Sequence, residues 1–154
     1  MFKKLAKGLS KISSNKVDTP FIESVMQVVD GEKIGESQDG HFYIGFNEIS
    51  GYLFLETLLA SSIAIKTFDG ATLDFKSTNG DFSMISDTKE LASEFSKHIN
   101  RHMTECSFDI TEDLIKRIQK RDFETVSYSF KKKIILMDMV KASVSVSKEI
   151  TEEE

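Results

Sequence analysis

The chain has 154 residues, of which 40% are hydrophobic and 29% charged, with one Pro and one Cys; this composition is typical of one globular domain and excludes collagen-like and disordered chains. A lone cysteine, Cys106, cannot form an intramolecular disulfide or a multi-thiolate zinc site. Disulfide-stapled scaffolds are therefore excluded as well, and a reducing, cytoplasmic setting is expected.

The formal net charge of −5 is unevenly distributed along the chain. Residues 1–17 contain five Lys and no acid, residues 18–115 carry a net −12, residues 116–133 a net +5, and residues 134–154 a net −3. Two basic segments on an acidic chain indicate a contact surface for anionic lipid, nucleic acid or an acidic protein, unless oppositely charged segments face each other in the fold.

The N-terminal segment, residues 1–17, is predicted to be a basic amphipathic helix, because its large apolar side chains fall on one helical arc and its Lys side chains on the opposite arc. Lys residues interrupt every apolar run, so a secretory signal peptide is not expected. The stripe fits an anionic membrane surface or a groove on a protein, including this chain's own domain. The candidate membrane- or partner-binding residues are Phe2, Lys3, Lys4, Leu5, Lys7, Leu9, Lys11 and Ile12.

The first half of the remaining chain reads mainly as strands. Residues 20–29 begin with the Pro of a Thr19-Pro20 pair, which favours a helix and is the preferred interpretation, although their Val content favours a strand. Residues 31–40 are predicted to be a loop, and residues 41–46 and 52–55 to be strands. The apolar run 49–65 is shorter than a membrane-spanning helix and contains Glu56.

Residues 63–76 are predicted to be a β-hairpin around Asp69-Gly70. A three-residue loop with Gly70 in the left-handed conformation would pair Ile65 with Leu73 and keep the apolar side chains on one face. Another antiparallel strand is expected at residues 82–85.

Two consecutive helices are predicted next. Asp87 is a suitable N-cap, and apolar residues recur every four positions from Leu91 to Met103. Asp109 is the expected cap of the second helix. Strands follow at residues 125–130 and 133–139, with a weak edge strand at 142–146. We therefore expect an α+β fold: a mostly antiparallel sheet with two helices on one face, plus the N-terminal amphipathic helix, in a single domain of residues 18–147 with an acidic tail at 148–154.

Motifs for chemistry are sparse. The chain contains neither a GxxxxGK[ST] or GxGxxG phosphate-binding sequence nor a GxSxG nucleophile motif. His98, His102 and Cys106, at intervals of four, could share a metal on a helix. Helical projection instead places His102 and Cys106 in the apolar arc with His98 on its flank, so a buried Cys is expected and no metal or cofactor.

The second basic segment contains a candidate patch with aromatic residues nearby. Nucleic-acid-binding domains resemble this, but they are usually basic overall, whereas the pI of this chain is about 5.3. A solvated helix face beside a Lys-rich strand turn is the preferred interpretation. The residues of the patch are Lys116, Arg117, Lys120, Arg121, Lys131, Lys132 and Lys133.

We therefore expect a small non-enzymatic interaction module, attached through its N-terminal basic helix to a partner protein or, as the second choice, to an anionic membrane surface. It would be cytoplasmic, at most peripheral at the inner face of a membrane. The alternatives are a small enzyme or metal protein using His98, His102 and Cys106, and a nucleic-acid binder using residues 116–133.

Overall fold

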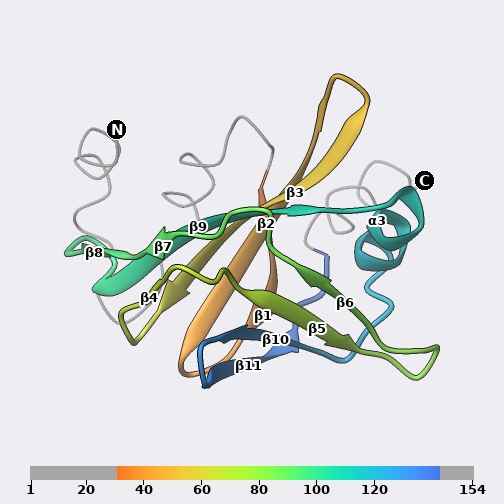
Figure 1. The fold of residues 1–154 in the computed structure, drawn as a ribbon. Coiled ribbons are helices and arrows are strands. Elements are labelled where there is room, and N and C mark those ends of the chain that lie inside the picture. Colours follow the sequence, from red (N-terminus) through yellow and green to blue (C-terminus); the bar gives the residue numbers. More distant parts are fainter. Residues whose placement is uncertain (1–30, 143–154) are drawn as a thin grey trace.

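The computed structural model describes residues 31–142, which form eleven strands and one short helix (Figure 1). The elements are β1 (Glu32–Glu36), β2 (Gly40–Ile49), β3 (Tyr52–Ser61), β4 (Lys66–Thr67), β5 (Thr72–Lys76), β6 (Phe82–Ile85), β7 (Leu91–Ala92), β8 (Glu94–Ser96), β9 (Arg101–Asp109), α3 (Glu112–Gln119), β10 (Thr125–Phe130) and β11 (Lys133–Met139).

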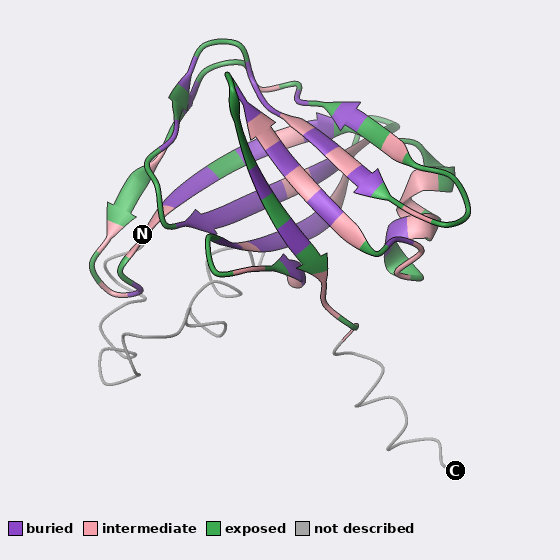
Figure 2. Ribbon diagram, turned by 90° about the horizontal axis from the view of Figure 1, so that it is seen from below, coloured by how far each residue is buried: buried purple, intermediate pink, exposed green. Residues whose placement is uncertain are grey.

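Nine of these strands form one antiparallel sheet in the order β6, β5, β10, β11, β1, β2, β3, β9 and β8. The sheet curls around so that its two ends meet, because Ser86, directly after β6, bridges Phe108 on β9. Beside this bridge the amide of Asp87 donates to the carbonyl of Ser107 at 2.7 Å. The strands therefore enclose a common interior (Figures 1 and 2).

The expected α+β class is wrong, since the described residues are mostly β with one helix of eight residues. Residues 87–103, predicted to be a helix, hold β7, β8 and the start of β9. A repeat of four is also an even number, so it fits one face of a strand as well as one face of a helix. The predicted loop at 31–40 is likewise wrong, because it contains β1.

The predicted hairpin at residues 63–76 does not form. β4 pairs with β7, whereas β5 lies between β6 and β10. The positive φ expected at Gly70 is confirmed at +76°. Its cause is different, since the Gly70 amide donates to the Lys89 carbonyl at 2.8 Å and its backbone passes close to Ser86.

The strands at 82–85, 125–130 and 133–139 are confirmed. In β10 every second residue is buried, as expected for a strand with one face toward the interior. Figure 2 shows the same banding along neighbouring strands. The interior is filled by apolar side chains from nearly every strand and from α3, among them Ile34, Phe42, Ile44, Leu55, Leu59, Leu73, Phe75, Phe108, Ile118, Val126, Tyr128 and Met137.

The N-cap of helix α3 lies two residues later than predicted. Thr111, not Asp109, is the N-cap, and its hydroxyl accepts a hydrogen bond from the Leu114 amide at 3.3 Å. Acidic residues occupy the first turn of the helix and basic residues the last, which suits the helix dipole. Ile118 is the buried residue that attaches α3 to the interior.

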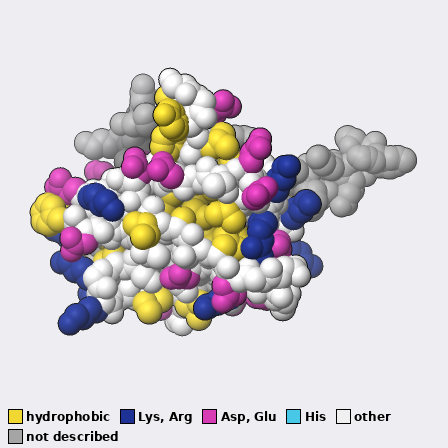
Figure 3. Space-filling model, turned by 45° about the vertical axis from the view of Figure 1, so that its right-hand side comes forward, with side chains coloured by type: hydrophobic (Ala, Val, Ile, Leu, Met, Phe, Trp, Pro, Cys, Tyr) yellow, Lys and Arg dark blue, Asp and Glu magenta, His cyan; other side chains and the backbone are white. Residues whose placement is uncertain are grey.

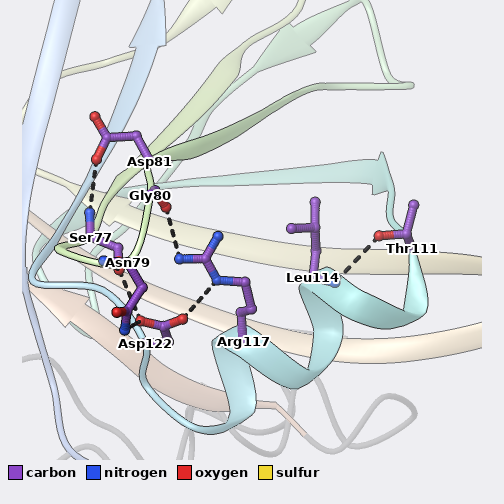
Figure 4. A network of polar contacts seen from close by, with 8 residues as sticks. All are labelled: Ser77, Asn79, Gly80, Asp81, Thr111, Leu114, Arg117 and Asp122. Atoms are coloured by element: carbon purple, nitrogen blue, oxygen red, sulfur yellow. Dashed lines mark hydrogen bonds and ion pairs between the residues drawn. The ribbon is translucent and has the colours of Figure 1, made fainter.

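Asp122, just after α3, ties the helix to the turn at residues 77–81 (Figure 4). Its carboxylate accepts hydrogen bonds from Ser77 Oγ and Asn79 Nδ2, each at 2.9 Å, and from Arg117 Nε at 2.8 Å. These donors stabilise the charged form and lower the pKa of Asp122 to about 2. The network places α3 against the end of the sheet next to β6.

Candidate interaction surface

The residues predicted to attach the protein, from Phe2 to Ile12, lie outside the described residues, as do residues 18–30 and the acidic tail. The expected weak edge strand at 142–146 also falls almost entirely beyond the described chain. Within residues 31–142, no helix is long and apolar enough to cross a membrane.

The second basic segment does not form one patch. Arg117 is held by Asp122 and the Gly80 carbonyl, with its guanidinium 4.3 Å from the ring centroid of Phe82. Arg121 is nearly buried and donates to the Val140 carbonyl at 2.8 Å and to Glu32 at 3.4 Å. Both arginines therefore hold the fold together.

The lysines of this segment are exposed but fall into two separate groups. Lys116 lies on α3 and Lys120 is the C-cap of this helix, before the start of β10. Lys131, Lys132 and Lys133 lie at the turn after β10. The six residues of β10 separate the two groups by about 20 Å.

His98, His102 and Cys106 are not on a helix, and the structure does not bring them together. His98 lies in the turn before β9, while His102 and Cys106 are four residues apart on that strand, about 13 Å. Among residues 31–142 no group of three or more His, Cys, Asp or Glu is arranged to hold a metal. Cys106 is buried, as expected, and burial raises the pKa of its thiol.

The outer face of β2, β3 and β9 carries an apolar strip that sequence reasoning missed. Tyr43 and Leu58 are cross-strand partners and both have 0% exposed surface, yet neither belongs to the interior core. Ala60 and Met103 are also partners on this face and are 0% and 4% exposed. We name these four residues the outer apolar strip.

An acidic hollow of about 360 Å³ adjoins the outer apolar strip at Met103. Besides Met103, the residues of its lining that the structure describes are Glu90, Ala92, Glu94 and Glu105. Pairing of β8 with β9 creates it, because Glu94 lies opposite Met103, and Glu105 is two residues further along the same face. We name Glu90, Glu94 and Glu105 the acidic hollow.

The charge in this hollow has no compensating cation among its described lining residues. The pKa of Glu105 is raised by burial and then by the neighbouring carboxylates of Glu56 and Glu94. A raised carboxyl pKa means that the ionised form is disfavoured in this position. A ligand that brings positive charge and an apolar side would therefore suit the acidic hollow and its Met103 floor.

The β2–β3 hairpin projects from the rest of the sheet (Figure 1). Ile49 and Tyr52 are paired at its tip and are 53% and 70% exposed. Figure 3 shows hydrophobic side chains along this projection and in a depression below it, with acidic side chains around them. Such exposed apolar groups are contact candidates.

The carboxylates of this surface are present in the sequence, but their grouping can be recognised only after the strand pairing is known. Glu94 and Glu105 are eleven positions apart, and only the β8–β9 turn brings them to one hollow. Comparison of the chain with family models, with curated proteins and with solved structures gave no match.

Proposed function

We propose that this protein is a small non-enzymatic interaction module that attaches reversibly, through residues 1–17, to an anionic membrane surface at the cytoplasmic side. The observation that supports it is the separation of charge. The described body, residues 31–142, contains 14 Lys or Arg and 18 Asp or Glu, and Arg117 and Arg121 are engaged in internal contacts. Residues 1–17, with five Lys and no acid, are the concentrated positive charge of the chain.

The energetics suit reversible attachment. Each of Phe2, Leu5, Leu9 and Ile12 contributes about 1.5–3 kcal/mol when fully buried in apolar surroundings. Each Lys near an anionic surface adds about 1 kcal/mol. Ordering the segment as a helix offsets part of this gain. The net result is weak binding to the surface. Because the acidic body is repelled by the same anionic lipids, this binding stays reversible.

A partner protein with an acidic, partly apolar groove is the second candidate. The acidic hollow of this chain illustrates the chemistry, since three carboxylates surround an apolar floor of Met103 and Ala92. Such a groove would bind the Lys side chains and the apolar side chains of residues 1–17 without lipid.

Co-sedimentation with vesicles tests the proposal. The full chain should bind vesicles of phosphatidylserine and phosphatidylcholine and ignore vesicles of phosphatidylcholine alone. Leu5→Glu with Leu9→Glu should abolish binding. The matched control is Ile134→Glu with Leu136→Glu, which changes two exposed apolar residues of β11 and should bind as the original chain does. A full chain that ignores both kinds of vesicle would refute membrane attachment and leave the partner protein.

A further inference from the structure

The β2–β3 hairpin carries an apolar patch on its outer face, where it projects from the sheet (Figure 1). The exposed cross-strand pair of Ile49 and Tyr52 lies at the tip. Phe54 follows two residues after Tyr52, so its half-buried side chain lies on the same face. Neighbouring exposed apolar side chains of this kind mark a contact surface. We name Ile49, Tyr52 and Phe54 the hairpin patch.

The segments that build and flank the hairpin patch carry acidic charge alone. Residues 42–65, which hold most of β2 and all of β3, contain no Lys or Arg, and neither do residues 102–115 of β9 and α3. The acidic residues of these two segments are Glu48, Glu56, Glu105, Asp109, Glu112 and Asp113. Asp109 is the register partner of Phe54, so it lies one strand spacing, about 5 Å, from the patch. The hairpin patch is therefore flanked by negative charge.

The pKa of Glu105 reports the same excess of negative charge on this face. It is raised first by burial and then by the carboxylates of Glu56 and Glu94. Glu56 lies two residues after Phe54 on β3, on the face of the hairpin patch. A cation brought to Asp109 and Glu56 would therefore relieve repulsion among these carboxylates.

We propose that the hairpin patch binds a cationic amphipathic segment of a partner protein. The apolar side chains of that segment would cover Ile49 and Tyr52, while its Lys or Arg side chains would face Asp109 and Glu56. The exposed ring of Tyr52 also offers its face to a cation. An amphipathic helix presents apolar and basic side chains side by side in this way, and an apolar strip beside acidic groups is the surface that complements it.

Other classes of ligand suit this surface less well. The carboxylates beside the hairpin patch repel phosphate groups, which disfavours both anionic lipid and nucleic acid. A second copy of the chain would place the same acidic surface against itself in a two-fold interface, so like charges would meet. A basic protein segment supplies both the apolar contact and the missing charge.

This inference goes beyond the proposed membrane attachment and does not rest on it. The attachment uses residues 1–17, whereas the hairpin patch lies on β2 and β3. Anionic lipids that attract residues 1–17 would repel the acidic hairpin. A module attached to a membrane would therefore keep the hairpin patch free for a protein partner.

An NMR titration of the full chain, labelled with nitrogen-15, tests the proposal. The probe is a synthetic peptide of Leu and Lys, about fourteen residues or four helical turns long, with one apolar and one basic face. Its addition should shift the amides of Ile49, Tyr52 and Phe54 to saturation, and the affinity should fall several-fold as sodium chloride rises from about 0.05 to 0.5 M. A matched peptide with Glu in place of every Lys should leave these amides unchanged. Saturating shifts confined to other surfaces, such as the acidic hollow, would overturn the proposal.

Substitutions in the hairpin patch make the test specific. Ile49→Ser with Tyr52→Ser should weaken binding of the Lys peptide by at least about ten-fold. The matched control, Ile134→Ser with Leu136→Ser, removes two equally exposed apolar side chains from β11 and should bind as the original chain does. Equal affinity in the hairpin variant and the original chain would overturn the proposal.

Neutralising the carboxylates tests the electrostatic half of the proposal. Asp109→Asn with Glu56→Gln should weaken binding several-fold at low salt and reduce its dependence on salt. An affinity as strong and as sensitive to salt as that of the original chain would overturn the role given to these two residues.

The same spectra identify any other occupant of the hairpin patch. Amides of the patch that shift when the chain alone is diluted would assign it to a second copy. Amides that shift in Leu5→Glu with Leu9→Glu, without any peptide, would assign it to residues 1–17 of this chain. Either result would overturn the proposal of a partner protein. Normal binding of the Lys peptide by a chain that ignores anionic vesicles would refute membrane attachment and support the hairpin patch.

Discussion

Arg117 and Asp122 form an ion pair across the C-terminal end of α3, with 2.8 Å between Nε and Oδ2. The same guanidinium reaches the Gly80 carbonyl, and the same carboxylate reaches Ser77 and Asn79. One short helix is thereby fixed to a turn about forty residues earlier in the chain. Both side chains are engaged in this internal network, although Arg117 belongs to the candidate basic patch.

Removing the Asp122 carboxylate should destabilise the fold. Asp122→Ala leaves Arg117, Ser77 and Asn79 without their shared acceptor, so thermal melting should fall by several degrees, whereas Asp109→Ala should melt within about one degree of the original chain. The pKa of Asp122 is lowered to about 2, so its contribution is present above pH 4 and is lost as the pH falls toward 2. Equal melting of the two proteins at pH 7 would contradict the role given to Asp122.

His41 should make stability fall between about pH 6.5 and pH 4. Burial, and then the positive charges of Lys33 and Arg101, lower its pKa to about 4, and Lys33 Nζ lies 3.3 Å from its Nδ1. The unfolded chain binds a proton near pH 6.5 while the folded chain does not, which favours unfolding by about 3 kcal/mol at most over this range.

Denaturant unfolding of the original chain and of His41→Gln at several pH values measures this effect. The difference in unfolding free energy between the two proteins should change between pH 6.5 and 4 and then level off. Lys33→Met should narrow the window, because it removes a charge that opposes protonation of His41. A pH-independent difference would show that His41 is protonated equally in both states.

Gly70 and Gly51 offer a matched pair of left-handed glycines. Both have positive φ, at +76° and +86°, but a Cβ on Gly70 would lie 2.5 Å from Ser86 Oγ, whereas a Cβ on Gly51 meets nothing within 4 Å. Replacing either glycine by Ala costs about 1 kcal/mol of backbone strain. Gly70→Ala should cost at least about 1 kcal/mol more than Gly51→Ala in denaturant unfolding, since the Ser86 hydroxyl also accepts a hydrogen bond from the Ala71 amide. Equal losses of unfolding free energy in the two variants would mean that the structure relieves the contact between the new Cβ and Ser86 Oγ at no cost.

Cys106 should resist alkylation in the folded protein. Its side chain is buried and its pKa is raised, so the reactive thiolate is scarce. Iodoacetamide labelling at pH 8, followed by mass spectrometry, should be slow in buffer and rapid in guanidinium chloride. Rapid labelling in buffer would require an open interior and would favour the alternative of a small enzyme that uses Cys106.

The local sequence pattern predicted strands correctly where the residue types of a segment left one interpretation. It failed where the spacing of the apolar residues fits both a helix and a strand. β10 follows from its alternating polarity, and β11 from the apolar run that comes after the Lys131-Lys132 turn. Leu91 and Met103 instead share an even spacing that a helix and a strand both satisfy. The partners of β5 could not be predicted, because β10 lies some fifty residues away in sequence.

Only one part of the candidate surface could be predicted from the sequence. The positive segment of residues 1–17 is evident from composition. The acidic hollow depends on the pairing of Glu94 with Met103, which strand periodicity does not encode. Charge counts also overstated the second basic segment, since Arg121 is used to hold Glu32 and Val140.

The salt dependence of vesicle binding by the full chain tests the central proposal most directly. If residues 1–17 attach through Lys and apolar side chains together, binding to phosphatidylserine-containing vesicles should weaken steadily as sodium chloride rises from about 0.05 to 0.5 M, because the Debye length shrinks from about 14 to 4 Å. Residual binding should then disappear in Leu5→Glu with Leu9→Glu. Binding that is absent at 0.05 M, or that is equally strong across the whole salt range, would contradict attachment through this segment.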